Sequence, residues 1–220
     1  PATAADAESD YQYTIKNGGA VILRYDGISQ SDKGILIPRT LGGYPVKEIG
    51  TQAFFYCPAS SISIPNTVEV IGDSAFYGCY FSNIQLPNNL KQIDDYAFYL
   101  CDNLESVTIP HGVTTIGEYA FSSCSDLTSV SIPRSVTTIG NNAFSDCHSL
   151  TTVNTHGDAS AYSASDLFYH TNASLIIYYD PETSGWSTPV WNGYRAYPYG
   201  TQFYHVTVIN GSGQDTYTAG

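Results

Sequence analysis

The chain has 220 residues and a formal net charge of −12 at pH 7, although only 13% of its residues are charged. An acidic surface repels phosphate groups, so this charge argues against nucleic acid and anionic membrane surfaces as partners. The sequence contains no apolar run of the length that crosses a membrane, and we expect no direct membrane insertion. The length suits one domain with short additions at its ends.

The first segments precede any repeat. Residues 1–10 are small, polar and acidic, and we expect them to be a linker. Residues 11–34 follow as an N-terminal β cap, because residues 11–25 read as two strands around Asn17-Gly18-Gly19. Asn-Gly supports the tight turn of a hairpin. Such a cap would cover the open core of the first repeat.

Residues 35–179 are organised as a repeat. The pair Ala-Phe recurs in five copies, and a cysteine follows each phenylalanine by three positions. The phenylalanines are Phe54, Phe76, Phe98, Phe121 and Phe144, so the period is 22 or 23 residues. A fixed period in the twenties is the sequence signature of a solenoid, in which each coil buries its apolar side against the next.

Each repeat begins with a strand that has one buried face. In residues 107–109, Val-Thr-Ile, apolar and polar residues alternate, which predicts that Thr108 points outward and its neighbours inward. Pro110 cannot donate to a strand ladder and ends the strand. Residues 113–116, Val-Thr-Thr-Ile, offer a second inward pair.

A sharp turn is expected after this pair, at Gly117. Gly50, Gly72 and Gly140 occupy the same position in other repeats, and Asp94 occupies it in the third. Asp tolerates the left-handed backbone region better than most residues, so we expect a left-handed conformation here. The Ala-Phe pair that follows would point into the core from a helical turn too short to be a true helix.

The cysteines hold equivalent positions in successive repeats, at Cys57, Cys79, Cys101, Cys124 and Cys147. Five cysteines in a secreted chain are also compatible with disulfides or a metal. Equivalent positions in a stack give parallel side chains that all point to the core, where a free cysteine behaves as a small apolar residue. We therefore expect a ladder of buried, reduced thiols.

The repeat decays toward its end. Leu167-Phe168 stands where Ala-Phe stood, Thr171 takes the cysteine position, and residues 175–179 are a last, more aromatic strand. Degeneracy of this kind is expected of a terminal, capping repeat.

Two further segments follow the repeat. Residues 180–203 form an aromatic tail rich in proline and glycine. Residues 204–220 look like the start of a further extracellular repeat module, so we expect the chain to be a fragment of a longer modular protein.

The pattern LxxVxIPxxVxxIGxxAFxxCxxL resembles the repeat of bacterial cell-surface leucine-rich repeat proteins of the BspA type, over about residues 35–179. The resemblance implies a right-handed leucine-rich-repeat superhelix with a parallel β-sheet on one face and short helical or 3-10 turns opposite. It also implies an extracellular location, at the cell surface or secreted, and a role in adhesion. It supplies no catalytic residues, because the repeated positions are core positions.

The sequence carries no enzyme motif of the GxSxG, HExxH, P-loop or GxGxxG kind. We therefore expect no catalytic residues and no cofactor. His156, Asp158, Asp166 and His170 are the one His/Asp cluster, and they lack the spacing of metal ligands. We expect no metal site.

One candidate binding surface is the outer face of the repeat strands. Its outward positions are Ser63, Gln85, Thr108, Ser131 and Asn154. This would be a flat sheet of small, uncharged polar residues. It lacks the Trp, Tyr and Arg anchors that are typical of interaction hot spots.

The second candidate surface is aromatic. It comprises Tyr77, Tyr96, Tyr99 and Tyr119 near the turns, with Trp186 and Trp191 in the tail. Rows of aromatic residues bind sugars or proteins by stacking. They also simply cover the flank of a solenoid, and the sequence leaves both roles open.

Two functions are compatible with these features. The first, which we prefer, is a non-catalytic, surface-exposed interaction or adhesion module. It would act as a monomer and bind a protein or glycan on a host, on matrix or on a neighbouring cell. The second is an accessory domain of a modular extracellular enzyme that degrades polysaccharide or protein.

Overall fold

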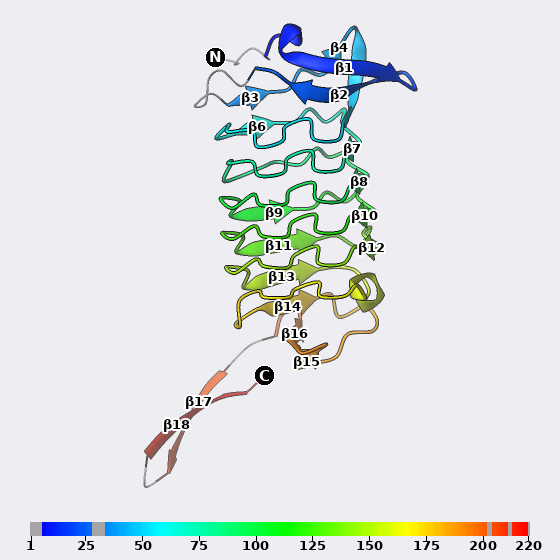
Figure 1. Ribbon diagram of the computed structural model, residues 1–220. Helices are drawn as coiled ribbons and strands as arrows, with labels where there is room; N and C mark the ends of the chain where they lie inside the picture. The colour runs from blue at the N-terminus through cyan, green and yellow to red at the C-terminus, as the bar shows by residue number, and fades with distance from the viewer. Residues whose placement is uncertain (1–5, 28–33, 202–203, 211–212, 220) are drawn as a thin grey trace.

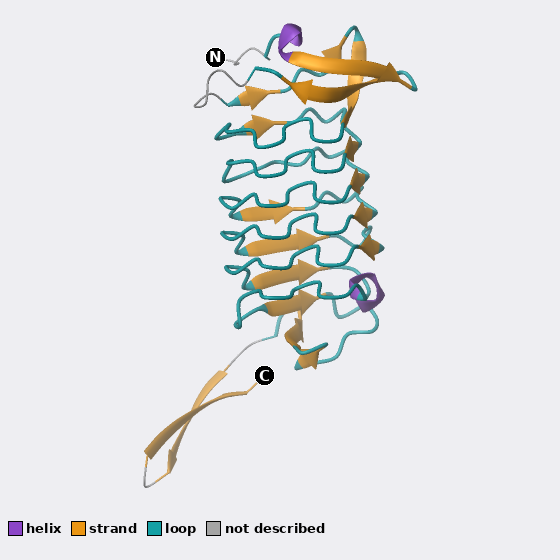
Figure 2. Ribbon diagram, in the orientation of Figure 1, coloured by secondary structure: helices purple, strands orange, loops and turns teal. Residues whose placement is uncertain are grey.

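The computed structural model describes residues 6–27, 34–201, 204–210 and 213–219. Figure 1 shows a stack of about eight coils, closed by strands at each end. Strands lie on two sides of the stack, while loops and turns make up most of the rest (Figure 2). The solenoid predicted from the repeat is confirmed.

One side of the stack is an eight-stranded sheet, built largely from the second apolar pair of each repeat. Parallel pairing places Ile116 beside Ile93 and Ile139, and Ile93 beside Ile71, so these residues form a buried ladder. The sheet runs through β1 (Tyr11–Lys16), β2 (Gly19–Tyr25), β5 (Tyr44–Ile49), β7 (Val70–Ile71), β8 (Gln92–Ile93), β10 (Thr115–Ile116) and β12 (Thr138–Ile139), with β4 (Thr40–Leu41) beside β5. The segment that carries the second inward pair of each repeat thus also forms short strands, and these pair in parallel between neighbouring coils.

The other side carries the repeat strands that end at proline. They alternate buried and outward residues, as in β11, where Val130 and Ile132 are buried and Ser131 faces out. The sheet runs through β9 (Ser106–Thr108), β11 (Ser129–Ile132), β13 (Thr152–Thr155), β14 (Ile176–Tyr179), β16 (Tyr194–Pro198) and β15 (Val190–Trp191). Bridges from Ser63 to Gln85 and from Asn83 to Ser106 continue it to β6 (Ile62–Ser63) and β3 (Ile35–Leu36).

The Ala-Phe segments are turns, where the sequence suggested short helical pieces. Gln52, Phe54 and Tyr56 each donate their backbone N–H to the next coil, at 2.7–2.9 Å, while Ala53 and the alternate residues bond within the turn. Gln52 and Tyr56 adopt the left-handed conformation, with φ of 58° and 52°. Half of the N–H groups therefore serve neighbouring coils, which prevents a continuous helix. Among the described residues, the 3-10 helices are η1 (Glu8–Asp10) and η2 (Ala159–Tyr162).

The repeated glycine has a different role from the one expected. Gly117 has no positive φ; instead, a Cβ on it would lie 2.4 Å from the backbone nitrogen of Asp95 in the preceding coil. The glycine therefore allows close approach of two backbones. The left-handed residues come two positions later, at Tyr96 (φ 56°) and Tyr119 (φ 53°). Asp94 is likewise not left-handed, and burial raises the pKa of its carboxyl.

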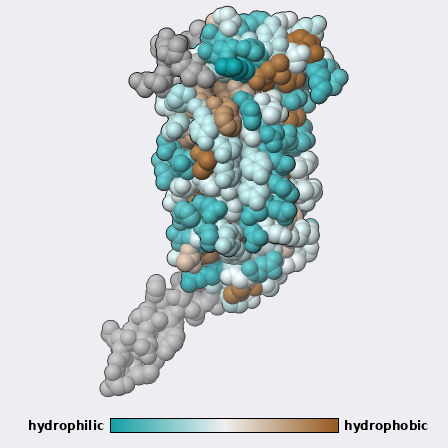
Figure 3. All heavy atoms as spheres, viewed as in Figure 1, coloured by the Kyte–Doolittle hydropathy of each residue, from teal (hydrophilic) through white to brown (hydrophobic). Residues whose placement is uncertain are grey.

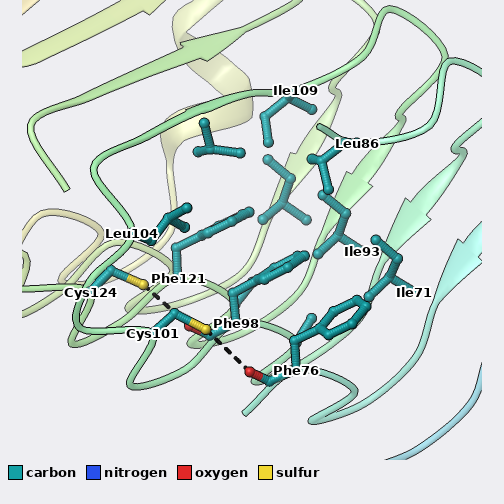
Figure 4. Packing of buried hydrophobic residues seen from close by; sticks show 14 of the residues in the cluster. Ile71, Phe76, Leu86, Ile93, Phe98, Cys101, Leu104, Ile109, Phe121 and Cys124 are labelled. Carbon is teal, nitrogen blue, oxygen red and sulfur yellow. Dashed lines mark hydrogen bonds between the residues drawn. The ribbon is translucent and has the colours of Figure 1, made fainter. Parts of the chain in front are cut away.

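The core consists of ladders that run along the stack (Figure 4). The rings of Phe76, Phe98 and Phe121 stack on one another with centroids 5.3 and 5.0 Å apart. All five cysteines are free and buried. The Sγ of Cys101 donates a hydrogen bond to the carbonyl oxygen of Phe76 in the preceding coil, at 3.1 Å. The expected cysteine ladder is thus present, and its thiols also serve as donors.

The N-terminal cap is the expected hairpin around Asn17. Its strand β2 pairs antiparallel with β1 and parallel with β5, and the ring of Tyr25 stacks on Phe54 at 5.3 Å. Residues 6–10 contact this cap, where the sequence suggested a linker: the carboxylate of Glu8 accepts hydrogen bonds from the Tyr13 hydroxyl and the Gly42 backbone. Residues 1–5 of that segment lie outside the described residues.

The aromatic tail closes the opposite end. Strand β16 pairs parallel with β14, and β15 pairs antiparallel with β16. Part of residues 180–203 therefore extends the sheet beyond residue 179, where the repeat had been expected to end. The two ends are closed in the same way, by an antiparallel hairpin whose inner strand joins the solenoid.

Residues 204–220 contain a further hairpin. Strands β17 (Tyr204–Asn210) and β18 (Gly213–Ala219) pair antiparallel as a two-stranded sheet of their own. Isolated two-stranded hairpins are at most marginally stable in water. Its assignment to a further module stays a prediction.

Candidate binding surfaces

The outer face of the repeat strands brings most of the first candidate residues into one row. Ser63 pairs with Gln85, and Ser131 lies between Thr108 and Asn154. Beyond Asn154 the row continues with two tyrosines, Tyr178 and Tyr197. The outward direction predicted from strand alternation is confirmed by the exposure or half-exposure of all five polar residues.

Two adjoining hollows lie along this row, and we call them together the sheet-face groove. The first has a volume of about 450 Å³ and includes Ser63 and Gln85. The second has a volume of about 650 Å³ and includes Gln85, Thr108 and Ser131. Gln85 and Leu86 border both hollows, so the two hollows adjoin at this coil. Asn154, the last predicted residue of the row, does not line it.

A second wall of the groove comes from the turn after each proline, which sequence reasoning missed. Asn66, Asn88 and His111 follow the repeated proline in successive coils and line the groove. The turns are tied together because Asn88 donates its backbone N–H to the side-chain oxygen of Asn66, at 2.9 Å. A polar residue after each proline was the available signal, but only the stacked coils show that it faces the same hollow as the strand residues.

The tyrosines of the second candidate surface form a separate contact network, which we call the tyrosine strip: Phe55, Tyr56, Tyr77, Tyr96, Tyr99 and Tyr119. Ring centroids of Tyr77 and Tyr99 are 5.0 Å apart, and those of Tyr96 and Tyr119 are 5.0 Å apart with planes 5° from parallel. Burial raises the pKa of Tyr77, and the neighbouring Tyr56 hydroxyl raises it further. Because the rings stack on one another, much of their face area is already covered.

The two tryptophans belong to the part of the aromatic tail that closes the end of the stack, residues 180–198, which we call the C-terminal cap. They do not belong to the tyrosine strip. Trp191 is only 8% exposed, and its ring lies 4.7 Å from that of Trp186. Trp186 stacks on Tyr179 at 5.3 Å and donates its indole N–H to the carbonyl oxygen of Gly157, at 3.1 Å. Trp191 is therefore buried at the end of the core and Trp186 packs against it partly buried, while their role as a ligand platform stays a prediction.

The His/Asp cluster noted in the sequence is split among other partners. His170 faces Asp146, with 3.2 Å between Nδ1 and Oδ1, and His156 lies 3.9 Å from Asp180. Asp158 accepts hydrogen bonds from the backbone and hydroxyl of Ser184, which lowers the pKa of its carboxyl. Within the described part of the chain, no three His, Cys, Asp or Glu side chains come together as a possible metal site.

The surface is mixed rather than broadly apolar. On the face shown in Figure 3, hydrophilic and intermediate residues dominate the coils, and hydrophobic residues are scattered, several of them near the N-terminal end. None of the described helices is long and apolar enough to span a membrane.

A stacked solenoid with one ladder of isoleucine, one of phenylalanine and a strand face of outward polar residues defines a leucine-rich repeat protein. The family model for the BspA type leucine rich repeat region matches residues 47–174 in six copies. This chain therefore belongs to the BspA-type leucine-rich repeat family.

Two solved structures show the relationship in detail. A leucine-rich repeat protein of T. pallidum, TpLRR, is 31% identical with a TM-score of 0.72, over 79% of this chain and 81% of that chain. The pneumococcal vaccine antigen PcpA is 26% identical with a TM-score of 0.60, over 78% of this chain but 48% of that chain. No curated protein matches this chain.

Proposed function

We propose that this chain acts by binding, as a non-catalytic interaction module outside the cell. An extended segment of the partner, a protein or glycan on a host, on matrix or on a neighbouring cell, would lie in the sheet-face groove. The single observation that carries this proposal is the row of two adjoining hollows lined by Ser63, Gln85, Thr108 and Ser131. An extended polymer is the shape that a groove running across several coils accommodates.

The composition of the groove supports a binding role because packing does not dictate it. Core positions carry the same residue in coil after coil, as with Phe98, Phe121 and Phe144. Outward positions are free of that constraint, and they change from Gln85 to Thr108 between neighbouring coils. A constant frame with a variable face is the arrangement that solenoid proteins use for recognition.

The tyrosine strip is the weaker candidate for the same role. Its end residues are accessible, with Phe55 41% and Tyr56 49% exposed. Its inner rings stack on one another, which leaves mainly their edges for a partner. Stacking of this kind contributes about 0.5–1.5 kcal/mol per pair to the fold, so the strip has a structural role without any ligand.

The extracellular location rests on the family and on a neighbour. The chain belongs to the BspA-type repeats, and the related PcpA is described as a vaccine antigen. A surface location of this chain would make its groove accessible to partners outside the cell.

The test uses a side chain that fills the groove. Thr108→Tyr places a bulky residue at an exposed strand position inside the second hollow, where an aromatic residue is compatible with a strand. Thr138→Tyr makes the same change at an exposed strand position of the other sheet. Retention of the unaltered chain and both variants would be measured on arrays of extracellular-matrix proteins and glycans.

We expect the unaltered chain and Thr138→Tyr to be retained equally, and Thr108→Tyr to lose about tenfold or more in affinity, which is about 1.4 kcal/mol. Circular dichroism would confirm that both variants fold. Equal binding by all three proteins, or no retention on any array, would contradict the proposal.

A further inference from the structure

We propose that the sheet-face groove takes an extended, acidic polypeptide segment; this inference rests on the proposed function. The first observation is electrostatic. The chain contains 20 Asp and Glu residues, yet none of the described residues that line the groove is a carboxylate. The basic side chains of the lining are Arg39 in the first hollow and His111 and His156 in the second.

The carboxylates lie on other surfaces. Glu69 pairs with Lys47 on the other sheet, and Asp95 accepts the backbone N–H of Glu118 beside the Ala-Phe turn. A carboxylate of a bound segment would therefore meet more like charge on those surfaces than in the groove, where Asp180, paired with Arg134 and 3.9 Å from His156, is a carboxylate beside the lining. Like charges placed opposite each other weaken association. An acidic segment would therefore be repelled by the acidic surfaces outside the groove and less by the lining, which favours binding in the groove.

The second observation concerns the polar groups of the lining. Four side-chain amides face the groove, from Asn66, Asn83, Gln85 and Asn88, along with several hydroxyls. An amide both donates and accepts hydrogen bonds, which matches the alternating N–H and C=O groups of an extended polypeptide backbone. Hydrogen bonds to the peptide backbone supply affinity, and Arg39, the one Arg or Lys side chain of the described lining, supplies the preference for acid. His111 and His156 add to this preference in their protonated form.

The same lining fits a glycan less well. Sugar rings stack on open aromatic faces in addition to their hydrogen bonds with polar side chains, so a glycan site commonly offers an aromatic platform. The described groove lining contains no Phe, Tyr or Trp side chain. The aromatic rings lie instead in the tyrosine strip and in the C-terminal cap around Trp186 and Trp191.

The length of the groove sets the length of the segment. Five coil steps separate the turn of Arg39 from that of His156, because the row passes through Ser63, Gln85, Thr108, Ser131 and Asn154. At about 4.8 Å per step the groove spans roughly 24 Å, and an extended chain advances about 3.3 Å per residue. A segment of roughly seven residues therefore reaches from one basic end to the other.

The experiment is a selection of random dodecapeptides displayed on phage, carried out on the immobilised full chain. Enriched peptides would be synthesised, and their dissociation constants measured against the unaltered chain and the groove-filling variant Thr108→Tyr. Two isosteric charge variants sharpen the test. Gln85→Glu puts one carboxylate at the junction of the two hollows, and Gln52→Glu makes the same change at an exposed turn residue away from the groove.

We expect the enriched peptides to be rich in Asp and Glu and poor in Lys and Arg. Their affinity should fall about tenfold with Gln85→Glu and change less than about twofold with Gln52→Glu, since only the first places like charge against the ligand. Enrichment of basic or neutral peptides, unchanged or stronger binding to Gln85→Glu, or failure to enrich any peptide would overturn this inference.

The outcome also separates this inference from the proposed function. Glycans that lose binding to Thr108→Tyr, in the absence of any enriched peptide, would leave the groove as the binding site but refute the acidic polypeptide. Peptides that bind Thr108→Tyr as well as the unaltered chain would refute both.

Discussion

The Sγ of Cys101 donates a hydrogen bond to the carbonyl oxygen of Phe76, 3.1 Å away in the preceding coil. The same contact recurs through the stack, from Cys79 to Phe54, from Cys124 to Phe98 and from Cys147 to Phe121, at 3.1–3.2 Å. Each thiol thus fills space in the core and also donates to a carbonyl of the preceding coil; the carbonyl oxygens of Phe54, Phe76 and Phe98 in addition accept the backbone N–H of the cysteine in their own turn. Two predictions follow from these roles.

The first prediction compares two replacements of Cys101. Cys101→Ala should lower the free energy of unfolding by roughly 1–2 kcal/mol, through lost burial and a small cavity. Sequence alone suggests that Cys101→Ser costs more, because a hydroxyl would lie among apolar residues. The hydrogen bond changes this expectation: serine keeps a donor, so its cost should be similar to that of alanine. Urea unfolding tests this, and a serine variant far less stable than the alanine variant would contradict it.

The second prediction concerns pH. Burial raises the pKa of Cys101 and Cys147 to about 12 from an ordinary value of 9.0, and raises the pKa of Cys124 well above that value. The folded chain therefore keeps protons that the unfolded chain releases. The stability that these thiols contribute is fully present below pH 9 and is lost as pH rises from about 9 toward 12.

Urea midpoints between pH 8 and 11 would measure this loss, with Cys101→Ala as the control that should lose less. A thiol reagent at pH 8 should find five thiols in denaturant and almost none in the folded chain, because all five cysteines are buried. Fewer than four thiols in denaturant without reductant would mean that disulfides have been missed.

The third prediction concerns close contact between coils. Gly117→Ala would place a Cβ 2.4 Å from the backbone nitrogen of Asp95, and backbone cannot move aside as a flexible side chain can. We expect a loss of about 1–3 kcal/mol or more. Gly157→Ala is the matched control, since its nearest neighbour would be 3.7 Å away, and it should cost about 0.5 kcal/mol or less. Equal stability of the two variants in urea would refute the close-approach role.

Much of the fold could be predicted because the repeat imposes the same environment in every coil. The inward positions of Phe98 and Cys101 follow from their recurrence, since residues repeated at one place in a stack must form a ladder. The second sheet was missed because Thr115–Ile116 is only two residues long and carries no strand alternation. The left-handed conformation of Tyr119 was also missed, because a bulky residue rarely adopts it and the neighbouring Gly117 was the more obvious candidate.

The site was predictable in part for a related reason. Strand alternation predicts that Thr108 and Ser131 point outward. It does not predict how far the turns after each proline project beside the strand face. The groove exists because Asn88 and His111 stand next to the strand face, and that depends on how successive coils are tied together. The packing of the tail could not be predicted because Trp186 and Trp191 lie outside the repeat period, which therefore says nothing about the burial of Trp191.

The fourth prediction concerns the C-terminal cap. Trp191→Ala should open the last coils, because Trp191 fills the end of the core against Trp186 and Tyr162. In a solenoid each coil contacts only its neighbours, so the loss should stay local. Hydrogen–deuterium exchange should become faster in residues 150–198 and remain unchanged in residues 47–110. Uniformly faster exchange would show instead that the stack unfolds as one unit.

The central claim, that partners bind in the sheet-face groove, is tested most directly by hydroxyl-radical footprinting. The chain would be oxidised alone and when saturated with the matrix protein, glycan or peptide that binds it. His111 is exposed and lines the groove, while Tyr56 is 49% exposed at the tyrosine strip. The proposal predicts that oxidation of His111 falls on binding and that of Tyr56 does not change. Protection of Tyr56 with no change at His111 would contradict it.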